Sequence, residues 1–214
     1  RNMEDYFLSL FRCPECQTAF YFSAEESRVG PTCGTLTCRN RHTFRIQDGI
    51  PTFLTATGEN EKNAQDEDTV KSFGFEWQWD HTPRTKEDLH FRVLEKPNIA
   101  SEFLRGKLVL DVGCGAGLQA KIMAECGAKV IGVDLSDAVK AAYKNNSALR
   151  GTVCIARADI FRLPFAEETF DYVYCEGVLQ HTRDPRAAFY QLTRLVKKGG
   201  QIFSTFYTRR EGWY

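Results

Sequence analysis

The residue types best suited to chemistry lie in a short glycine-rich segment, 108–118, which reads LVLDVGCGAGL. Its apolar first half favours a buried strand, and Gly113, Gly115 and Gly117 follow at alternate positions. Glycine adopts positive φ without penalty and lets a ligand approach bare backbone. A strand, a glycine turn and a helix hold nucleotide-like ligands at the carboxyl end of the strand in open α/β sheets. The segment therefore predicts a nucleotide-type binding turn.

A second acidic position supports this interpretation. The segment Lys129–Asp134, KVIGVD, is another apolar strand, and it ends in a carboxylate 23 positions after Asp111. The two oxygens of a carboxylate can accept hydrogen bonds from both hydroxyls of a ribose. We therefore expect an adenosine-type cofactor. The run GCGAGL departs from the dinucleotide pattern G-x-G-x-x-G/A, which argues against a nicotinamide dinucleotide and a dehydrogenase.

Five segments in order resemble the class I S-adenosylmethionine-dependent methyltransferases. They are DVGCGAG at 111–117, VIGVDLS at 130–136, ARADIFRLPF at 156–165, FDYVYCEGVLQHTRDP at 170–185 and LVKKGGQIFSTFY at 195–207. The resemblance covers roughly residues 85–207. It implies a Rossmann-like methyltransferase fold, S-adenosylmethionine as cofactor and methyl transfer as the activity.

The resemblance also assigns roles in holding the methionine end of the cofactor. Gly113, Cys114 and Gly115 would line it, and Asp111 at the strand tip would order the loop. On the nucleoside, Asp134 would bind the ribose diol.

The adenine contacts follow from the same resemblance. Leu135 would pack on the adenine, Asp159 would accept a hydrogen bond from the adenine amino group, and Ile160 would lie against the ring. The alternative is that these residues are ordinary turn and capping residues.

Methyl transfer from a sulfonium is an in-line displacement, so alignment of the nucleophile and exclusion of water supply much of the acceleration. Glu176 and Gly177 would lie beside the methionine moiety and face the acceptor. An oxygen nucleophile often needs a general base. His181 is the first candidate because imidazole titrates near neutrality, and Glu176 is the second. The alternative role for His181 is structural hydrogen bonding.

A cysteine-rich N-terminus predicts a metal site. Cys13 and Cys16 form a C-x2-C knuckle, and the second pair is either Cys38 with His42 or Cys33 with Cys38. Zinc takes four tetrahedral nitrogen or sulfur ligands in structural sites. We favour Cys13, Cys16, Cys38 and His42, with Cys33 as the alternative ligand. This segment resembles the zinc-ribbon module that precedes some bacterial rRNA methyltransferases, and disulfides in a secreted domain are the competing interpretation.

Composition limits the cellular setting and the acceptor. The 214 residues are 43% hydrophobic and carry 28 basic and 28 acidic side chains, so no broad basic field exists to collect phosphates. We expect a small-molecule or biosynthetic-intermediate acceptor. The alternatives are an rRNA or tRNA methyltransferase that recognises RNA through the ribbon, and a non-catalytic scaffold. No apolar run reaches membrane-spanning length and no signal peptide is evident, so we expect a cytoplasmic protein without membrane contact.

The elements that must position these residues alternate between strand and helix, which predicts an α/β, doubly wound, mostly parallel sheet. We expect five strands, at 107–112, 129–134, 152–156, 170–175 and 200–206. We expect helices at 119–126, 136–149 and 184–196, and a helical segment at 86–104 that Pro97 interrupts.

Three regions are expected along the chain: a zinc ribbon at 1–54, a linker with a lid-like aromatic segment at 55–84, and the cofactor domain at 85–214. The aromatic segment, FGFEWQW at 73–79, has four aromatics at alternate positions. The resembling fold adds two antiparallel strands after the fifth, whereas this sequence stops at Tyr214. We therefore expect a fragment, or a partner, second copy or N-terminal segment that covers the exposed sheet edge.

Overall fold

A computed structural model describes residues 3–24, 33–54 and 85–206. The expected linker and the aromatic segment at 73–79 lie outside the described residues. Within the described part, no helix has the length and apolar character needed to cross a bilayer.

The bounds of the elements after residue 85 largely follow the predicted pattern, whereas α1 and the four strands before residue 54 were not predicted individually. The strands are β1 (Phe20–Ala24), β2 (Gly34–Cys38), β3 (Thr43–Gln47), β4 (Ile50–Thr52), β5 (Leu108–Val112), β6 (Lys129–Asp134), β7 (Val153–Arg157), β8 (Phe170–Glu176) and β9 (Val196–Thr205). The helices are α1 (Met3–Leu10), α4 (Lys86–His90), α5 (Ser101–Leu104), α6 (Leu118–Glu125), α7 (Ala138–Asn145) and α8 (Pro185–Leu195). Short π or 3-10 turns are η1 (Phe91–Glu95), η2 (Ser147–Leu149), η3 (Ile160–Arg162) and η4 (Leu179–His181).

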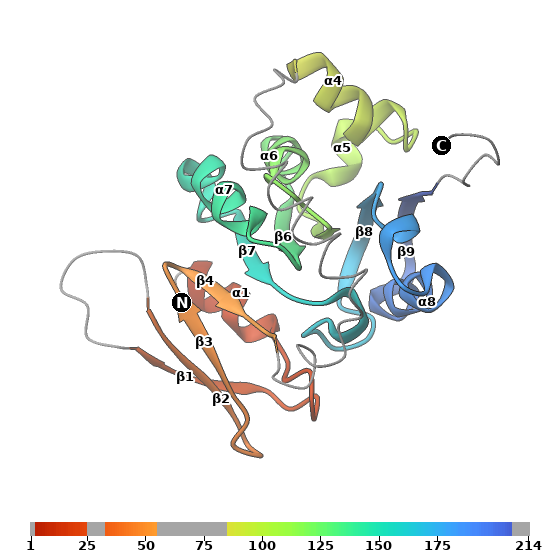
Figure 1. Ribbon diagram of the computed structural model, residues 1–214. Coiled ribbons are helices and arrows are strands. Elements are labelled where there is room, and N and C mark those ends of the chain that lie inside the picture. Colours follow the sequence, from red (N-terminus) through yellow and green to blue (C-terminus); the bar gives the residue numbers. More distant parts are fainter. Residues whose placement is uncertain (1–2, 25–32, 55–84, 207–214) are drawn as a thin grey trace, which may run out of the picture.

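Five parallel strands form the main sheet in the order β7-β6-β5-β8-β9. Helices cover both faces, which confirms the predicted doubly wound α/β architecture (Figure 1). Helices α4 to α7 bury one face of the sheet with residues such as Met123 and Val139. The other face packs against α8 through Leu192 and against α1 through Phe7. The strand order places the tips of β5 and β6 side by side.

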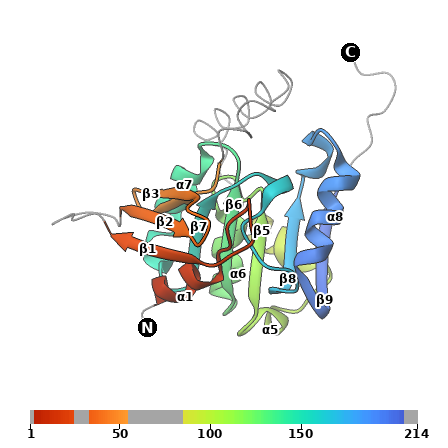
Figure 2. The ribbon, with the colours of Figure 1, turned by 90° about the horizontal axis from the view of Figure 1, so that it is seen from below.

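The N-terminal strands continue the main sheet. Strands β1 to β4 pair in antiparallel order, and β4 then pairs in parallel with β7 through Thr52 and Arg157. The Phe53 N–H also donates to the carbonyl of Arg157 at 2.8 Å. The result is a nine-stranded sheet in which β1 and β9 are the two end strands (Figure 2). The N-terminal segment therefore extends the β7 edge and leaves the β9 edge uncovered by the described residues.

The last helix and strand differ from the prediction. Asp184 caps α8 and Pro185 is its first residue, as expected, but α8 ends at Leu195 and β9 begins at Val196 rather than at residue 200. Val196 pairs with Phe170, and the register then shifts so that Tyr172 pairs with Gln201. Gly199, at φ +76°, accommodates this irregularity. Helix α7 also starts later than predicted, with Asp137 rather than Ser136 at its N-cap.

The helical segment before the main sheet is interrupted, as predicted at Pro97. Thr85 begins α4 with a capping box, in which its hydroxyl accepts from the Asp88 N–H and the Asp88 carboxylate accepts from the Thr85 N–H. The chain continues into η1, a π-helical turn, and then breaks before α5. This arrangement carries Arg92 and Lys96 toward the tip of β8.

Candidate cofactor site and metal cluster

The glycine turn after β5 adopts the backbone that its sequence predicts. Gly113, Gly115 and Gly117 have φ values of +72°, +51° and +72°. The N–H groups of Gly113 and Cys114 both donate to the carbonyl of Val133 on β6, at 2.8 and 3.0 Å. A Cβ at Gly113 would lie 2.2 Å from Cγ2 of Val178, so the turn is in close contact with the loop after β8. A residue with a side chain would therefore not fit at position 113 without displacing Val178.

Asp134 connects the two strand tips. Its Oδ2 accepts from the Gly115 N–H at 2.9 Å, and its Oδ1 accepts from the backbone N–H and the hydroxyl of Ser136 at 2.8 and 2.7 Å. The carboxylate therefore lies beside the glycine turn at the carboxyl end of the sheet. Each carboxylate oxygen has about two lone-pair sites, so Oδ2 retains capacity for a further donor. Ribose binding by Asp134 stays a prediction.

Asp111 is a buried acid with an unsatisfied oxygen. The residue is 2% exposed, and Oδ2 has no hydrogen-bond partner among the described residues. Burial, reinforced by the negative charges of Asp134 and Glu176, raises the pKa of Asp111 to about 8. A positively charged ligand in this turn would relieve that cost. The amino and sulfonium groups of S-adenosylmethionine are such charges, so the residues fit the cofactor that the sequence predicts.

Glu176, at the tip of β8, lies in a charge cluster that the sequence motifs did not indicate. Its Oε1 accepts from Arg92 at 3.1 Å and Lys96 at 2.6 Å, and its Oε2 accepts from the Tyr174 hydroxyl at 2.8 Å. Burial opposes ionisation of this carboxyl, but the hydrogen bonds from Lys96 and Tyr174 and the charge of Arg92 outweigh burial and lower its pKa. Glu176 is therefore an ionised, paired carboxylate and a weak base.

The loop after Glu176 carries His181 and contacts the glycine turn through Val178. Gly177, at φ +71°, donates its N–H to the Thr205 hydroxyl at 3.0 Å. His181 ends η4, and its N–H donates to the carbonyl of Val178, the residue that contacts Gly113. Burial lowers the pKa of His181, so its imidazole is neutral at pH 7 and able to accept a proton. The loop therefore contacts the glycine turn through Val178, and a catalytic role for His181 stays a prediction.

The predicted adenine residues surround the tips of β6 and β7. The Ala158 N–H donates to the Asp134 carbonyl at 3.1 Å, and Arg157 Nε donates to the Leu135 carbonyl at 2.9 Å. Asp159 caps η3, with its Oδ1 accepting from the Phe161 N–H at 2.9 Å. Ile160 opens η3 and is partly buried. Leu135, Asp159 and Ile160 are therefore brought to the same sheet edge as Asp134.

Cys114 is placed in the turn, but its thiol points into the core. The residue is 4% exposed, and a Cβ on Gly132 of β6 would lie 3.2 Å from Cys114 Sγ. Burial, together with the charges of Asp134 and Asp111, raises the pKa of this thiol well above its usual range. Only the backbone of Cys114 is available to line a ligand.

Four N-terminal side chains form a compact cluster with metal-ligand geometry. The ligand atoms of Cys13, Cys16, Cys38 and His42 all lie within 4.8 Å of one another. The Cys16 and Cys38 sulfurs are 3.6 Å apart, and the His42 Nδ1 is 3.4 Å from the Cys13 sulfur and 3.5 Å from the Cys38 sulfur. Tetrahedral zinc with Zn–S bonds near 2.3 Å requires sulfur separations of about 3.8 Å. The favoured ligand set is therefore assembled, and Cys33 is not part of the cluster.

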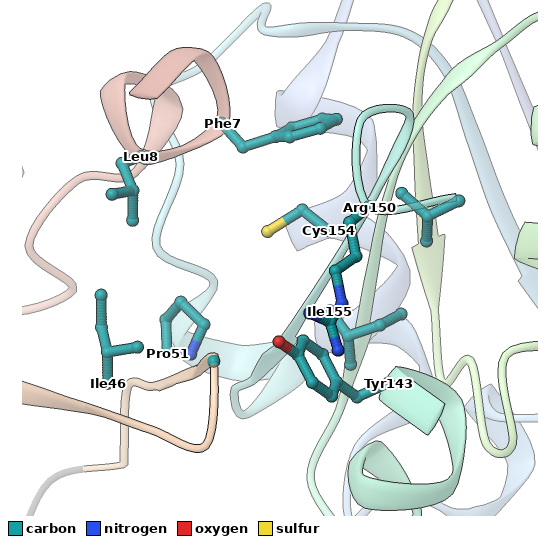
Figure 3. A pocket seen from close by; sticks show the side chains of 10 residues that line it. Phe7, Leu8, Ile46, Pro51, Tyr143, Arg150, Cys154 and Ile155 are labelled. Carbon is teal, nitrogen blue, oxygen red and sulfur yellow. The ribbon is translucent and has the colours of Figure 1, made fainter. Parts of the chain in front are cut away.

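A small cavity lies between the N-terminal strands and the main sheet, away from the strand tips. It measures about 70 Å³, and its lining includes Phe7 of α1, Pro51 of β4 and Cys154 of β7 (Figure 3). At its edge the Arg150 guanidinium lies 4.9 Å from the centre of the Tyr143 ring. The cavity is a packing gap at the junction and contains none of the predicted cofactor residues.

The residues of the main sheet are similar to a known protein family. Residues 110–204 match a family model described as a methyltransferase domain. This segment, which is fewer than half of the 214 residues, is similar to that family, and we call it the methyltransferase domain. The match starts in β5 and ends in β9, so it includes every strand tip described above.

Two curated relatives of the methyltransferase domain are ubiquinone biosynthesis O-methyltransferases. The Pseudomonas paraeruginosa protein is 39% identical over 114 residues, which cover 52% of this chain and 49% of that protein. The Pseudomonas fluorescens protein is 38% identical over the same length and coverage. The chain spans about half the length of the curated relatives it matches.

Solved structures agree on the fold of the methyltransferase domain. A Methanococcus maripaludis protein described as a candidate S-adenosyl-L-methionine-dependent methyltransferase superposes with a TM-score of 0.51 and 21% identity, covering 68% of this chain and 67% of that chain. A chain from the complex of the Haloferax volcanii Trm112 methyltransferase activator with a candidate methyltransferase superposes with a TM-score of 0.50 and 19% identity. The superposition covers 64% of this chain and 58% of that chain. At these identities the likeness shows the fold alone, which is the Rossmann-like methyltransferase fold predicted.

Proposed function

We propose that this protein transfers a methyl group from S-adenosylmethionine to a hydroxyl group of a small-molecule acceptor. The observation that carries the proposal is the joined strand tips, where the Asp134 carboxylate accepts from the Gly115 N–H and where buried Asp111 has an Oδ2 without a partner among the described residues. The methyltransferase domain supports the donor. The names of the Pseudomonas relatives support an oxygen acceptor in a biosynthetic intermediate.

The cofactor would be held at three points. The glycine backbone and Asp111 would take the methionine end, Asp134 would take the ribose, and Asp159 would take the adenine. When bound, S-adenosylmethionine supplies a sulfonium methyl whose C–S bond breaks as the methyl carbon bonds to the acceptor oxygen, which leaves S-adenosylhomocysteine. The protein aligns the acceptor and excludes water from the strand tips.

The acceptor hydroxyl must lose its proton, and of the two candidates His181 has the more suitable protonation state. Its lowered pKa keeps the imidazole neutral at pH 7, so it is available as a base. Glu176 is already neutralised by Arg92 and Lys96, which makes proton abstraction by it less favourable. We assign Glu176 the role of holding η1 against the tip of β8. We assign His181 the role of the general base that takes the proton from the acceptor hydroxyl.

The N-terminal cluster is assigned a structural zinc ion held by Cys13, Cys16, Cys38 and His42. Four protein ligands leave no open coordination position for a substrate, as is usual for structural zinc sites. The strands around the cluster are short, so a metal cross-link would add to the stability that they gain by packing on the main sheet.

Replacing His181 with Asn is expected to lower kcat for a phenolic acceptor about 100-fold while KM for S-adenosylmethionine changes less than about twofold, because only proton transfer is lost. Wild-type kcat should fall as the pH drops through the lowered pKa of His181, which lies below the ordinary 6.5, and kcat of the variant should show no such fall. Transfer of tritium from the labelled methyl donor measures kcat, KM and their dependence on pH. A variant as fast as the wild type would remove His181 from the mechanism, and labelling of RNA instead of the phenols would overturn the acceptor class.

A further inference from the structure

The metal-binding knuckle touches the segment that carries the predicted adenine contacts. The Arg12 N–H donates to the Pro164 carbonyl at 2.8 Å, and Phe11 forms an antiparallel bridge with Phe165. The rings of Phe11 and Phe165 stack with centroids 5.4 Å apart, and both residues are almost fully buried. The residues just before the first metal ligand, Cys13, therefore pair directly with the chain that follows β7.

A second contact comes from within the knuckle itself. Glu15, between the ligands Cys13 and Cys16, accepts a hydrogen bond from Arg162 at 3.1 Å, and the two side chains are 32% and 33% exposed. The knuckle is closed by backbone bonds, from the Gln17 N–H to the Cys13 carbonyl at 2.8 Å and from the Cys13 N–H to the Thr18 carbonyl at 2.9 Å. The position of Glu15 is thus fixed by the same turn that presents the two thiolates.

The segment 159–165 has little regular structure of its own. Its single 3-10 turn, η3, is closed by the Arg162 N–H donating to the Asp159 carbonyl at 2.9 Å. One isolated turn fixes several dihedral angles for one hydrogen bond and is unstable without tertiary contacts. Those contacts come from the knuckle on one side, and from Phe170 and Arg183 on the other.

We propose that the metal-binding knuckle positions the adenine subsite of the methyltransferase domain, with Glu15 and Phe11 as positioning residues that act through Arg162 and Phe165 on Asp159. The inference rests on the proposed function, because Asp159 matters only if an adenine binds there. It gives the N-terminal cluster a role in cofactor affinity. Loss of the metal would release the knuckle and with it the segment 159–165.

The test is charge reversal in the full-length chain, with affinity for S-adenosylhomocysteine measured by calorimetry. Glu15→Arg places two cations in contact and should weaken binding about fivefold, in line with a partly exposed ion pair. The exchanged pair E15R/R162E should restore affinity to within about twofold. The control is Glu125→Arg, which reverses a carboxylate that is 37% exposed and pairs with the 68% exposed Lys86 on the far helices, and it should leave affinity unchanged. Chelation of the metal should weaken binding more than E15R does.

A second ligand separates positioning from general destabilisation. S-inosylhomocysteine lacks the adenine amino donor, so the contact with Asp159 is already missing and E15R should weaken its binding less than about twofold. Equal weakening of both nucleosides by E15R, or no effect on either, would overturn the proposal.

Hydrogen exchange tests the same idea without any ligand. The amides of residues 160–163 and 165 should exchange faster in E15R and after chelation, and should exchange at the wild-type rate in E125R. Unchanged exchange would contradict the positioning role. If the wild-type protein binds neither nucleoside while E15R still shows faster exchange than the wild type, the proposed function is refuted. The structural coupling between the knuckle and segment 159–165 would then still hold.

Discussion

Gly113→Ala is expected to weaken S-adenosylhomocysteine binding about 100-fold, equivalent to about 2.7 kcal/mol. Two effects combine at this residue. An alanine at φ +72° costs about 1 kcal/mol, and its Cβ would overlap Cγ2 of Val178 at 2.2 Å. Because Val178 is β-branched and stiff, the overlap displaces the turn or the loop that carries His181. Calorimetric titration of the purified variant measures the loss.

The chain offers a matched control for this substitution. Gly106 has the same φ of +72°, but a Cβ there meets nothing within 4 Å. Gly106→Ala should therefore lose a similar amount of stability from backbone strain and keep wild-type affinity to within about twofold. Equal affinity in the two variants would mean that the close contact at Gly113 plays no part in binding.

Removal of the metal is expected to be the largest stability change available in the N-terminal strands. Cys38→Ser should abolish metal binding and lower the free energy of unfolding of this region by roughly 3 kcal/mol, because Cys38 is a buried ligand at the end of β2. Elemental analysis should find about one zinc ion per wild-type chain and none in the variant. Hydrogen exchange across β2 and β3 should report the lost stability.

Cys33→Ser is the control for the metal experiment. Cys33 lies outside the cluster of four ligand atoms, although the sequence alone left it as an alternative ligand. The variant should keep one zinc ion and wild-type exchange rates. Loss of zinc from Cys33→Ser, or its retention in Cys38→Ser, would contradict the assigned ligand set.

The strand tips were predictable because their signals are local. An apolar run before Gly113 and another before Asp134 each specify a strand that ends in a turn, and parallel strands bring such ends to one edge. The knuckle of Cys13 and Cys16 is equally local. The sequence already favoured His42 over Cys33, and the pairing of β2 with β3 gives the physical reason, because it holds Cys38 and His42 at one end of a hairpin.

Other features have no local signal. The pairing of Thr52 with Arg157 joins residues more than 100 positions apart, and a three-residue strand carries too little pattern to reveal its partner. The hydrogen bonds of Arg92 and Lys96 to Glu176 join residues 84 and 80 positions apart, and they lack a local signal in the same way. The early start of β9 depends on a register shift opposite Phe170, which apolar periodicity cannot indicate.

Titration of the full chain with S-adenosylhomocysteine, for the wild type and for Asp134→Ala, tests the central claim most directly. We expect saturable one-to-one binding to the wild type and an affinity at least about 30-fold lower for the variant, because the ribose loses its acceptor and the glycine turn loses its bond from Gly115 to Oδ2. Circular dichroism would verify that both proteins are folded. A folded wild-type protein that shows no binding, or a variant that binds equally well, would contradict the claim that these strand tips form a cofactor site.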